Sequence, residues 1–240
     1  MSSPSLSTAF FWCVVPAAGR GTRVGGDCPK QYLPLAGRAL ILHTLERLAA
    51  HPRISGLLVT LGSVDAHWPE IDSMHGKPVF TAVGGAERSD SVLAGLEALP
   101  SDVGADDFVL VHDAARPCVR QADISRLIDL CTKVDGGLLG APLRDTLKRA
   151  DDASRSMATE SRDERWRAFT PQMFRRGQLS AALREVAARG ARISDEAMAM
   201  EQAGFAPLLV EGAEDNIKVT TAADFALAEF LLARTNDAHR

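Results

Sequence analysis

Short apolar runs alternate with amphipathic stretches along most of the chain. The runs that have the length and apolar content of buried strands are Phe10–Pro16, Gly56–Leu61, Val79–Val83, Asp107–Val111, Leu138–Pro142 and Leu208–Val210. Apolar residues at helical spacing predict helices over Leu40–Ala50, Ser91–Leu99, Asp123–Lys133, Gln178–Arg189 and Ala222–Ala233. Strands that alternate with helices favour right-handed crossovers and a mostly parallel sheet. The pattern therefore predicts an α/β fold with a Rossmann-like sheet flanked by helices.

One domain accounts for this pattern over about residues 10–235. The 240 residues are enough to bury a substantial core, and no internal repeat or shift in composition marks a second globular unit. Residues 1–9 are polar, with serines and one proline, and we expect a short disordered tail there. The alternation breaks over about residues 143–168, which are rich in charge and poor in aliphatic side chains. Composition leaves open whether this segment is a flexible loop or a long ordered excursion.

The run that ends at Pro16 passes directly into a loop of small residues. Small side chains let backbone amides approach an anion closely, and Arg23 and Lys30 place two cations beside the loop. A Walker A loop is excluded, because no Gly-Lys is followed by Ser or Thr, and Val24 replaces the third glycine of a dinucleotide fingerprint. A polyphosphate site and an ordinary glycine-rich turn both remain open. The small residues concerned are Ala17, Ala18, Gly19 and Gly21.

Three loops that carry candidate functional residues follow predicted strands. They begin at Ala17, at Gly84-Gly85 and at His112-Asp113. In a parallel sheet, ligands bind outside the carboxyl ends of the strands, so we expect these loops to converge at one edge. His112 by itself is more typical of a packed strand-end histidine than of a catalyst.

The composition argues against several classes of binding partner. A net charge of −4 argues against a nonspecific nucleic-acid binder, and no apolar run approaches the roughly 20 residues that a membrane span needs. The four cysteines are scattered without a CxxC pair, which indicates a reduced, cytoplasmic protein. The six histidines do not cluster at metal-ligand spacing, and we name no metal-binding residue.

The order of several motifs along the chain is more specific for a protein family than any single motif. The sequence resembles the 2-C-methyl-D-erythritol 4-phosphate cytidylyltransferases of the non-mevalonate isoprenoid pathway over about residues 10–235. Each motif is weak alone, but their order is specific. The segments that carry the resemblance are Val14–Arg23, Pro29–Tyr32, Gly84–Val92, Val111–Pro117, Arg144–Lys148, Thr170–Gln172, Ser194–Glu196 and Asp215–Thr220.

The resemblance implies a site for each substrate, CTP and a polyol phosphate. It assigns catalytic charge stabilisation to Arg23, Lys30 and Lys218. Nucleotide binding is assigned to Ala17, Ala18, Gly19, Gly21, Gly84, Gly85, Asp90, Ser91 and Ala114. Polyol phosphate binding is assigned to Asp113, Arg116, Thr146, Arg162 and Ser194, the last of which replaces the more usual threonine. From the residues alone, solvated cations, a helix cap after the Gly-Gly turn and a strand-end salt bridge are the alternatives.

The chemistry that follows needs no protein base. A phosphate monoester has a second pKa of about 6, so it is already anionic when it attacks the α-phosphorus and releases pyrophosphate. Positioned cations and amides bring the two anions together. The resemblance also implies Mg²⁺, held mainly by phosphate and water, and a homodimer in which residues about 143–168 form a β-arm that reaches the second subunit.

Two other functions share these motifs. A ribitol 5-phosphate cytidylyltransferase would keep the loop, Lys30 and the Asp113 segment, and its arm would contact a different polyol. An inactive nucleotide-binding regulator would keep the fold, although the presence of Arg23, Lys30 and Lys218 argues against it. Enzymes that use UTP or GTP fit the Asp113–Pro117 segment poorly.

Overall fold

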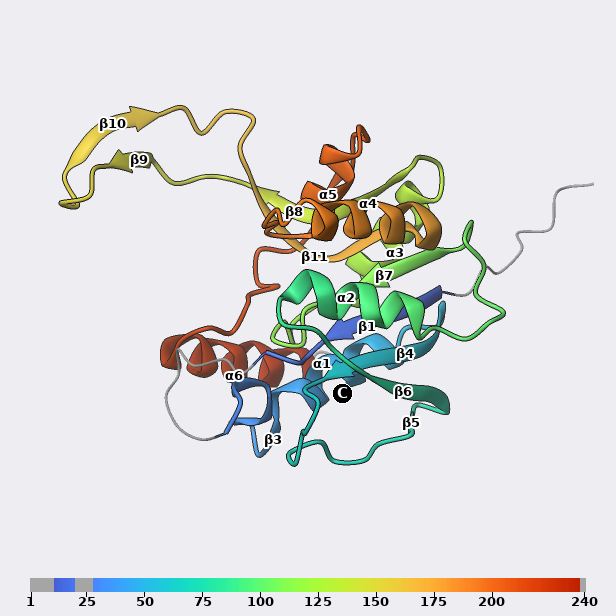
Figure 1. The fold of residues 1–240 in the computed structure, drawn as a ribbon. Helices are drawn as coiled ribbons and strands as arrows, with labels where there is room; N and C mark the ends of the chain where they lie inside the picture. Colours follow the sequence, from blue (N-terminus) through green and yellow to red (C-terminus); the bar gives the residue numbers. More distant parts are fainter. Residues whose placement is uncertain (1–10, 20–27, 238–240) are drawn as a thin grey trace, which may run out of the picture.

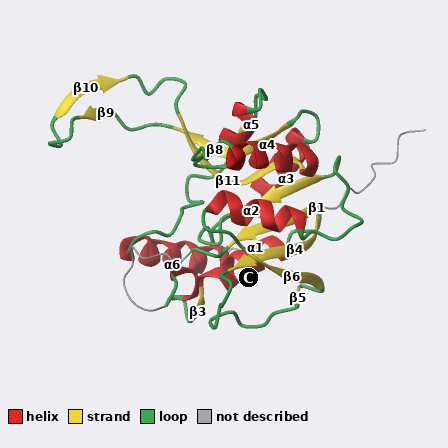
Figure 2. Cartoon of the chain, viewed as in Figure 1, coloured by secondary structure: helices red, strands yellow, loops and turns green. Residues whose placement is uncertain are grey.

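An eight-stranded mixed sheet organises the chain in the computed structural model, which describes residues 11–19 and 28–237 (Figures 1 and 2). Its strand order is β12-β8-β11-β7-β1-β4-β6-β5. The strands are β1 (Phe11–Pro16), β4 (Ile54–Leu61), β5 (Ser73–Met74), β6 (Lys77–Val83), β7 (Phe108–Val111), β8 (Gly136–Pro142), β11 (Trp166–Arg175) and β12 (Leu208–Glu211). Parallel pairing joins β7, β1, β4 and β6, and also β8 and β12. The predicted α/β fold is confirmed.

Helices cover both faces of this sheet. They are α1 (Leu40–Ala49), α2 (Arg88–Glu97), α3 (Gln121–Cys131), α4 (Arg176–Ala188), α5 (Glu196–Gln202) and α6 (Ala222–Asp237). The core on one face joins the sheet to α1 and α3, and the core on the other joins it to α2, α4 and α5. A short 3-10 helix, η2 (Lys30–Tyr32), leads into a two-stranded ribbon of β2 (Pro34–Leu35) and β3 (Arg38–Ala39). Helix α6 packs near this ribbon in a third, smaller core.

Strand β1 shows how the apolar pattern builds the two cores. Cys13 and Val15 are fully buried on the face of α1 and α3, while Val14, also fully buried, faces α2 and α4. Alternate side chains of a strand point to opposite faces, so a strand covered on both sides is apolar at most positions. This explains why a continuous apolar run, rather than an alternating one, marks the central strand.

Strand β11 corrects the sequence-based element pattern. No strand was expected over Trp166–Arg175, yet β11 lies in the middle of the sheet and pairs antiparallel with both β7 and β8. Polar residues and Pro171 hide it, because proline is rare in central strands. The polar side chains have partners: Thr170 bonds His112, and Gln172 bonds Asp195.

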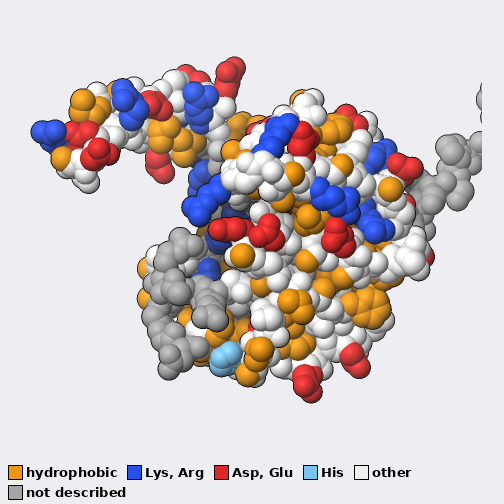
Figure 3. Space-filling model, in the orientation of Figure 1, with side chains coloured by type: hydrophobic (Ala, Val, Ile, Leu, Met, Phe, Trp, Pro, Cys, Tyr) orange, Lys and Arg blue, Asp and Glu red, His pale blue; other side chains and the backbone are white. Residues whose placement is uncertain are grey.

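The charged segment before β11 is ordered as an arm. Strands β9 (Leu147–Ala150) and β10 (Ser156–Glu160) form a separate antiparallel ribbon that protrudes from the body beyond β8 and β11 (Figure 1). Charged side chains of both signs are spread over it (Figure 3). The prediction of an ordered β-arm is therefore confirmed, and the flexible-loop alternative is wrong.

Of the predictions for the two ends of the chain, only the one for the final helix can be compared with the structure. The expected tail over residues 1–9 lies outside the described residues. The final helix begins as predicted, because Asp224 accepts hydrogen bonds from the backbone amides of Thr220 and Thr221, both at 2.7 Å. Among helices within the described residues, none combines the length and apolar character that crossing a membrane requires.

Candidate active site

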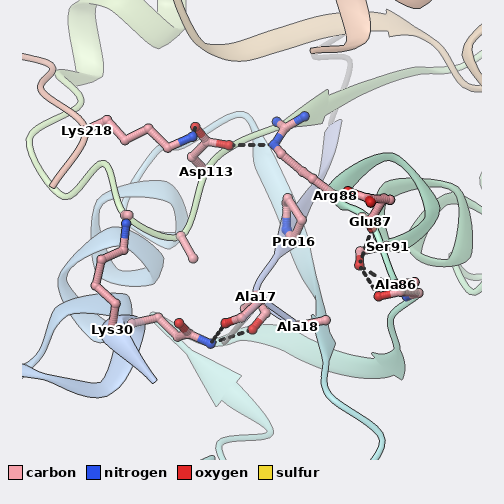
Figure 4. A pocket seen from close by; sticks show the side chains of 15 residues that line it. Pro16, Ala17, Ala18, Lys30, Ala86, Glu87, Arg88, Ser91, Asp113 and Lys218 are labelled. Carbon is pink, nitrogen blue, oxygen red and sulfur yellow. Dashed lines mark hydrogen bonds and ion pairs between the residues drawn. The ribbon is translucent and has the colours of Figure 1, made fainter. Parts of the chain in front are cut away.

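A pocket of about 230 Å³ opens at the carboxyl ends of β1 and β7 (Figure 4). This is the edge at which the sequence predicts three loops to converge, and all three contribute to it. The residues that line the pocket are Pro16, Ala17, Ala18, Gly19, Lys30, Gln31, Gly85, Ala86, Glu87, Arg88, Ser91, Asp113, Ala114, Ala115 and Lys218.

Gln31 anchors the small-residue loop. Its buried side-chain amide donates hydrogen bonds to the carbonyl oxygens of Ala17, at 2.7 Å, and Gly19, at 3.0 Å. The amide of Ala17 itself donates to Thr60 in β4, which ties the start of the loop to the sheet. One residue earlier, Lys30 extends its ammonium to the carbonyl oxygen of Val219, at 2.6 Å. The loop is therefore held from the side of η2 before any ligand arrives.

The Gly84-Gly85 turn packs closely against this loop. A Cβ atom on Gly84 would lie 2.6 Å from the Cβ of Ala18 and 2.8 Å from the hydroxyl of Ser91, so only glycine fits. The Ser91 hydroxyl also accepts from the amide of Gly85, at 3.2 Å. Helix α2 then begins with a capping box between Glu87 and Asp90. These contacts fix the turn beside Ala18, where Gly85 and Ser91 line the pocket.

Asp113 is the electrostatic centre of the pocket. Its carboxylate accepts from Arg88 at 2.9 Å and from Lys218 at 2.8 Å, and Arg116 lies 3.6 Å away. Burial alone would raise the pKa of Asp113, but these cations, Arg88 foremost, hold it well below its usual range. Asp113 is therefore a fixed anion that holds three cations in one place.

His112 stabilises the turn at Asp113 through buried hydrogen bonds. Its Nε2 donates to the carbonyl oxygen of Arg116, at 3.1 Å, so its Nδ1 accepts from the hydroxyl of Thr170, at 3.0 Å. The same hydroxyl oxygen accepts from the amide of Asp113, at 3.0 Å. Burial lowers the pKa of His112 to about 4, and the ring stays neutral. The expectation of a packed strand-end histidine is confirmed.

The structure brings most, though not all, of the expected residues to the pocket. Those that line it are Ala17, Ala18, Gly19, Lys30, Gly85, Ser91, Asp113, Ala114 and Lys218. Gly84 and Asp90 support the turn beside it, and Arg116 is buried behind Asp113, where it donates to the carbonyl oxygen of Asn216 at 2.7 Å. Gly21 and Arg23 lie outside the described residues.

Three expected acceptor residues do not line the pocket of their own chain. Thr146 and Arg162 are exposed at the base of the arm, where Arg162 donates to the carbonyl oxygen of Arg144. Ser194 is also exposed, and its neighbour Asp195 caps helix α5 by accepting from the amide of Met198, at 3.0 Å. The arm points away from the body (Figure 1), and Thr146, Arg162 and Ser194 are all exposed in a single chain.

Sequence reasoning missed three residues of the site. Gln31, Arg88 and Glu196 all lie within the motifs, but nothing in the sequence assigned them a role. Arg88 donates to Asp113 and also to Glu196, which is fully buried at the start of α5. Arg and Glu are normally exposed, and only their long-range pairing makes this burial possible.

Comparison with known proteins identifies the family. The family model described as 2-C-methyl-D-erythritol 4-phosphate cytidylyltransferase (IspD) matches residues 11–234. The chain belongs to this family. A relative of that name from Stenotrophomonas maltophilia strain K279a is 57% identical over 228 residues, which cover 95% of this chain and 98% of the relative. The resemblance drawn from the ordered motifs is confirmed, and the chain is a nucleotidyltransferase.

Solved structures of family members share the fold. The 2-C-methyl-D-erythritol 4-phosphate cytidylyltransferase of Francisella tularensis has a TM-score of 0.80 at 31% identity, over 93% of this chain and 100% of that chain. The enzyme of the same name from Thermus thermophilus has a TM-score of 0.75 at 30% identity, over 94% of this chain and 99% of that chain. The family fold, including its Rossmann-like sheet, thus extends over nearly the whole chain.

The donor set of the pocket suits a bound anion. Within residues 11–19 and 28–237, no three His, Cys, Asp or Glu side chains are grouped as a metal site would need. The pocket instead presents Lys30 and Lys218, and the oxygens of Asp113 already accept from cations. A divalent cation fits here as a partner of a polyphosphate, held by phosphate and water.

Proposed function

We propose that the enzyme transfers a cytidylyl group from CTP to 2-C-methyl-D-erythritol 4-phosphate and releases pyrophosphate, in isoprenoid precursor biosynthesis. The observation that carries this proposal is one pocket in which a small-residue loop and a Gly-Gly turn meet Lys30, Asp113 and Lys218. The acceptor phosphate attacks the α-phosphorus in line. Because that phosphate is already anionic near neutral pH, the protein supplies positioned charge rather than a base.

We assign Lys30 and Lys218 to different phosphate groups of the substrates. Lys30 lies beside the Ala17–Gly19 loop and contacts the triphosphate, together with Arg23. Lys218 lies beside Asp113 and contacts the phosphate that bridges the two substrates. Compact ammonium groups with three donors each suit oxygens that change position during the transfer. Mg²⁺ would be held mainly by phosphate oxygens of the nucleotide and by water, and would offset negative charge on the leaving pyrophosphate.

The part of the pocket lined by Ala18, Gly85 and Ser91 suits the base and ribose of the nucleotide. Close packing of Gly84 against Ala18 and Ser91 fixes the turn, and Gly85 lets backbone groups approach a base closely. We assign cytosine as that base from the family to which the chain belongs. Ala114 and Asp113 also line the pocket, where a carboxylate oxygen suits a hydroxyl of the polyol.

We further propose that the active site is completed by a second copy of the chain. Thr146 and Arg162 are exposed and do not line the pocket of their own chain, although both match positions that bind polyol phosphate in the family. The arm that carries them is an isolated two-stranded ribbon, and such a ribbon is marginal without a partner surface. A twofold dimer would supply that surface.

We place the enzyme in the cytoplasm. Cys13, Cys28, Cys118 and Cys131 are all free, and three of the four are buried. Unpaired thiols persist in a reducing compartment, which supports this assignment.

A pyrophosphate-release assay tests the function. The purified protein receives CTP and Mg²⁺ with either 2-C-methyl-D-erythritol 4-phosphate or ribitol 5-phosphate, and the better acceptor is then paired with UTP, GTP and ATP. We expect CTP and the methylerythritol phosphate to be preferred. Equal or better turnover of ribitol 5-phosphate would move the assignment to that polyol. No release from folded protein with any pair would favour a nucleotide-binding regulator.

A further inference from the structure

Arg88 joins three separate segments of the site. It is the first residue of α2, directly after the Gly84-Gly85 turn. Its Nε donates to Oδ1 of Asp113 at 2.9 Å, and its two terminal nitrogens donate to the carboxylate of Glu196 at 2.6 and 3.0 Å. Asp113 follows the end of β7, and Glu196 begins α5, one residue after the cap Asp195. One guanidinium therefore fixes the start of two helices and the end of a strand relative to one another.

The two oxygens of Asp113 have different partners. Oδ1 accepts from Arg88, whereas Oδ2 accepts from Lys218, at 2.8 Å (Figure 4). Because Arg88 holds Oδ1, rotation of the carboxylate is restricted, and Oδ2 stays directed at the Lys218 ammonium, with Arg116 Nε 3.6 Å from the same oxygen. The other two donors of that ammonium remain for a phosphate.

The charges around Arg88 add up to an anion site. Arg88, Arg116 and Lys218 carry three positive charges, and Asp113 and Glu196 carry two negative ones. These five side chains together have a net charge of +1. Glu196 is fully buried, and its hydrogen bonds with the Arg88 guanidinium offset part of the desolvation cost of the pair.

We propose that Arg88 is a positioning residue for the acceptor phosphate, acting through Asp113 and Lys218 on one side and through Glu196 and the Ser194 loop on the other. This inference rests on the proposed function. The inference predicts different effects on the binding of the two substrates. The Gly84-Gly85 turn, which we assign to the nucleotide, is held by the Glu87–Asp90 capping box and by Ser91, and neither contact involves the Arg88 side chain. Loss of that side chain should therefore affect the acceptor and leave CTP binding nearly unchanged.

The first test compares Arg88→Met and Arg88→Lys with the wild-type enzyme. A displacement of about 1 Å at a reacting group costs on the order of 100-fold in rate, and we expect Arg88→Met to lower kcat/KM for the polyol phosphate by about that factor. The KM for CTP should change less than about threefold. Arg88→Lys keeps the charge but cannot bond both carboxylates as the guanidinium does, and should lose about tenfold. Arg184→Met, which breaks an exposed pair with Glu97 of α2, is the matched control and should behave as wild type.

The second test separates positioning from folding. Arg88→Met alone leaves Glu196 buried and unpaired, so its midpoint of urea unfolding should fall. The double variant Arg88→Met/Glu196→Leu removes both charges and keeps the net charge of the remaining group at +1. We expect it to recover the unfolding midpoint while kcat/KM for the acceptor stays about 100-fold low.

Three results would overturn the inference. They are recovery of acceptor kinetics in the double variant, wild-type kinetics in Arg88→Lys, and a KM for CTP that rises as much as the KM for the acceptor. The wild-type enzyme is measured first, with CTP and 2-C-methyl-D-erythritol 4-phosphate. Absence of pyrophosphate release at that stage contradicts the proposed function itself, and is thereby distinguished from failure of the Arg88 inference.

Discussion

The ammonium of Lys30 donates a hydrogen bond to the carbonyl oxygen of Val219, 189 residues later in the chain, at a distance of 2.6 Å. Lys30 is the first residue of the 3-10 helix whose Gln31 anchors the small-residue loop, and Val219 directly follows Lys218. This contact brings the segments of two cations to the same side of the pocket (Figure 4). A ligand with several phosphates can therefore meet both lysines without a rearrangement of either segment.

Lys30→Ala should lower kcat by about 100-fold or more, because it removes a cation from the charge that develops on the phosphates. Lys30→Arg should also be poor, since a planar guanidinium does not replace a compact ammonium. Steady-state kinetics with both substrates varied measures this, and Lys133→Ala, at an exposed position in the turn after α3, is the control. A normal kcat with only a raised KM would show that Lys30 serves binding alone.

Gln31→Met should raise the KM for CTP about tenfold and leave the KM for the acceptor nearly unchanged. Methionine has a similar shape but cannot donate to the carbonyl oxygens of Ala17 and Gly19, so the loop loses its anchor. Two lost hydrogen bonds also cost about 1–3 kcal/mol of unfolding free energy. Kinetics and urea unfolding measure the two effects. An unchanged KM for CTP in a measurably destabilised variant would mean that the loop is fixed by other contacts.

Much of this site is predictable from the sequence because it follows from a simple rule of sheet topology. The buried run of β1 and the apolar run of β7 both stand out, and parallel strands end at a common edge. The loop after Pro16 and the turn at Asp113 therefore had to meet, and they do. Lys30 and Lys218 were found through the ordered motifs, since an isolated lysine carries no such signal.

The rest depends on long-range pairing that local patterns do not contain. Arg88 and Glu196 are 108 residues apart, and each alone is typical of an exposed helix start. Strand β11 was hidden for the same reason, because Gln172 is polar yet buried through its bonds to Asp195 and to the amide of Ala197. Only the folded chain shows that these polar groups have partners.

Stability should fall as the pH drops from 6.5 to 4, in part because of His112. Burial lowers the pKa of this ring from 6.5 to about 4. In that window the unfolded chain binds a proton that the folded chain does not, so protonation favours unfolding by on the order of 3 kcal/mol at the lower end. Urea unfolding at several pH values measures the slope.

His112→Phe identifies the share of this slope that belongs to the His112 ring. The variant loses the bonds to Thr170 and Arg116, so it should be less stable than wild type at pH 7, with a flatter decline toward pH 4. A slope remains, because burial foremost, with Lys77 and Arg53, also lowers the pKa of His51 to about 4. A slope equal to that of wild type would show that His112 does not titrate in this window.

Mixed dimers test whether each site is shared between two chains. Under the proposed arrangement, Lys30 serves the pocket of its own chain and Arg162 serves that of the partner. Lys30→Ala and Arg162→Ala homodimers should both be nearly inactive. A heterodimer of the two collects both defects in one site and none in the other. With random exchange half the dimers are mixed, so about a quarter of all sites become intact by twofold symmetry.

The measurement is to unfold and refold the two variants together and to assay pyrophosphate release. Activity should rise from the low level of either variant toward about a quarter of wild type. Refolding each variant alone controls for reactivation, and a mixture with wild type in which one chain carries a removable tag shows that subunits have exchanged. No recovery despite demonstrated exchange would mean that each site is built within one chain. Thr146 and Arg162 would then have to reach the pocket by movement of their own arm, which extends away from it in this structure.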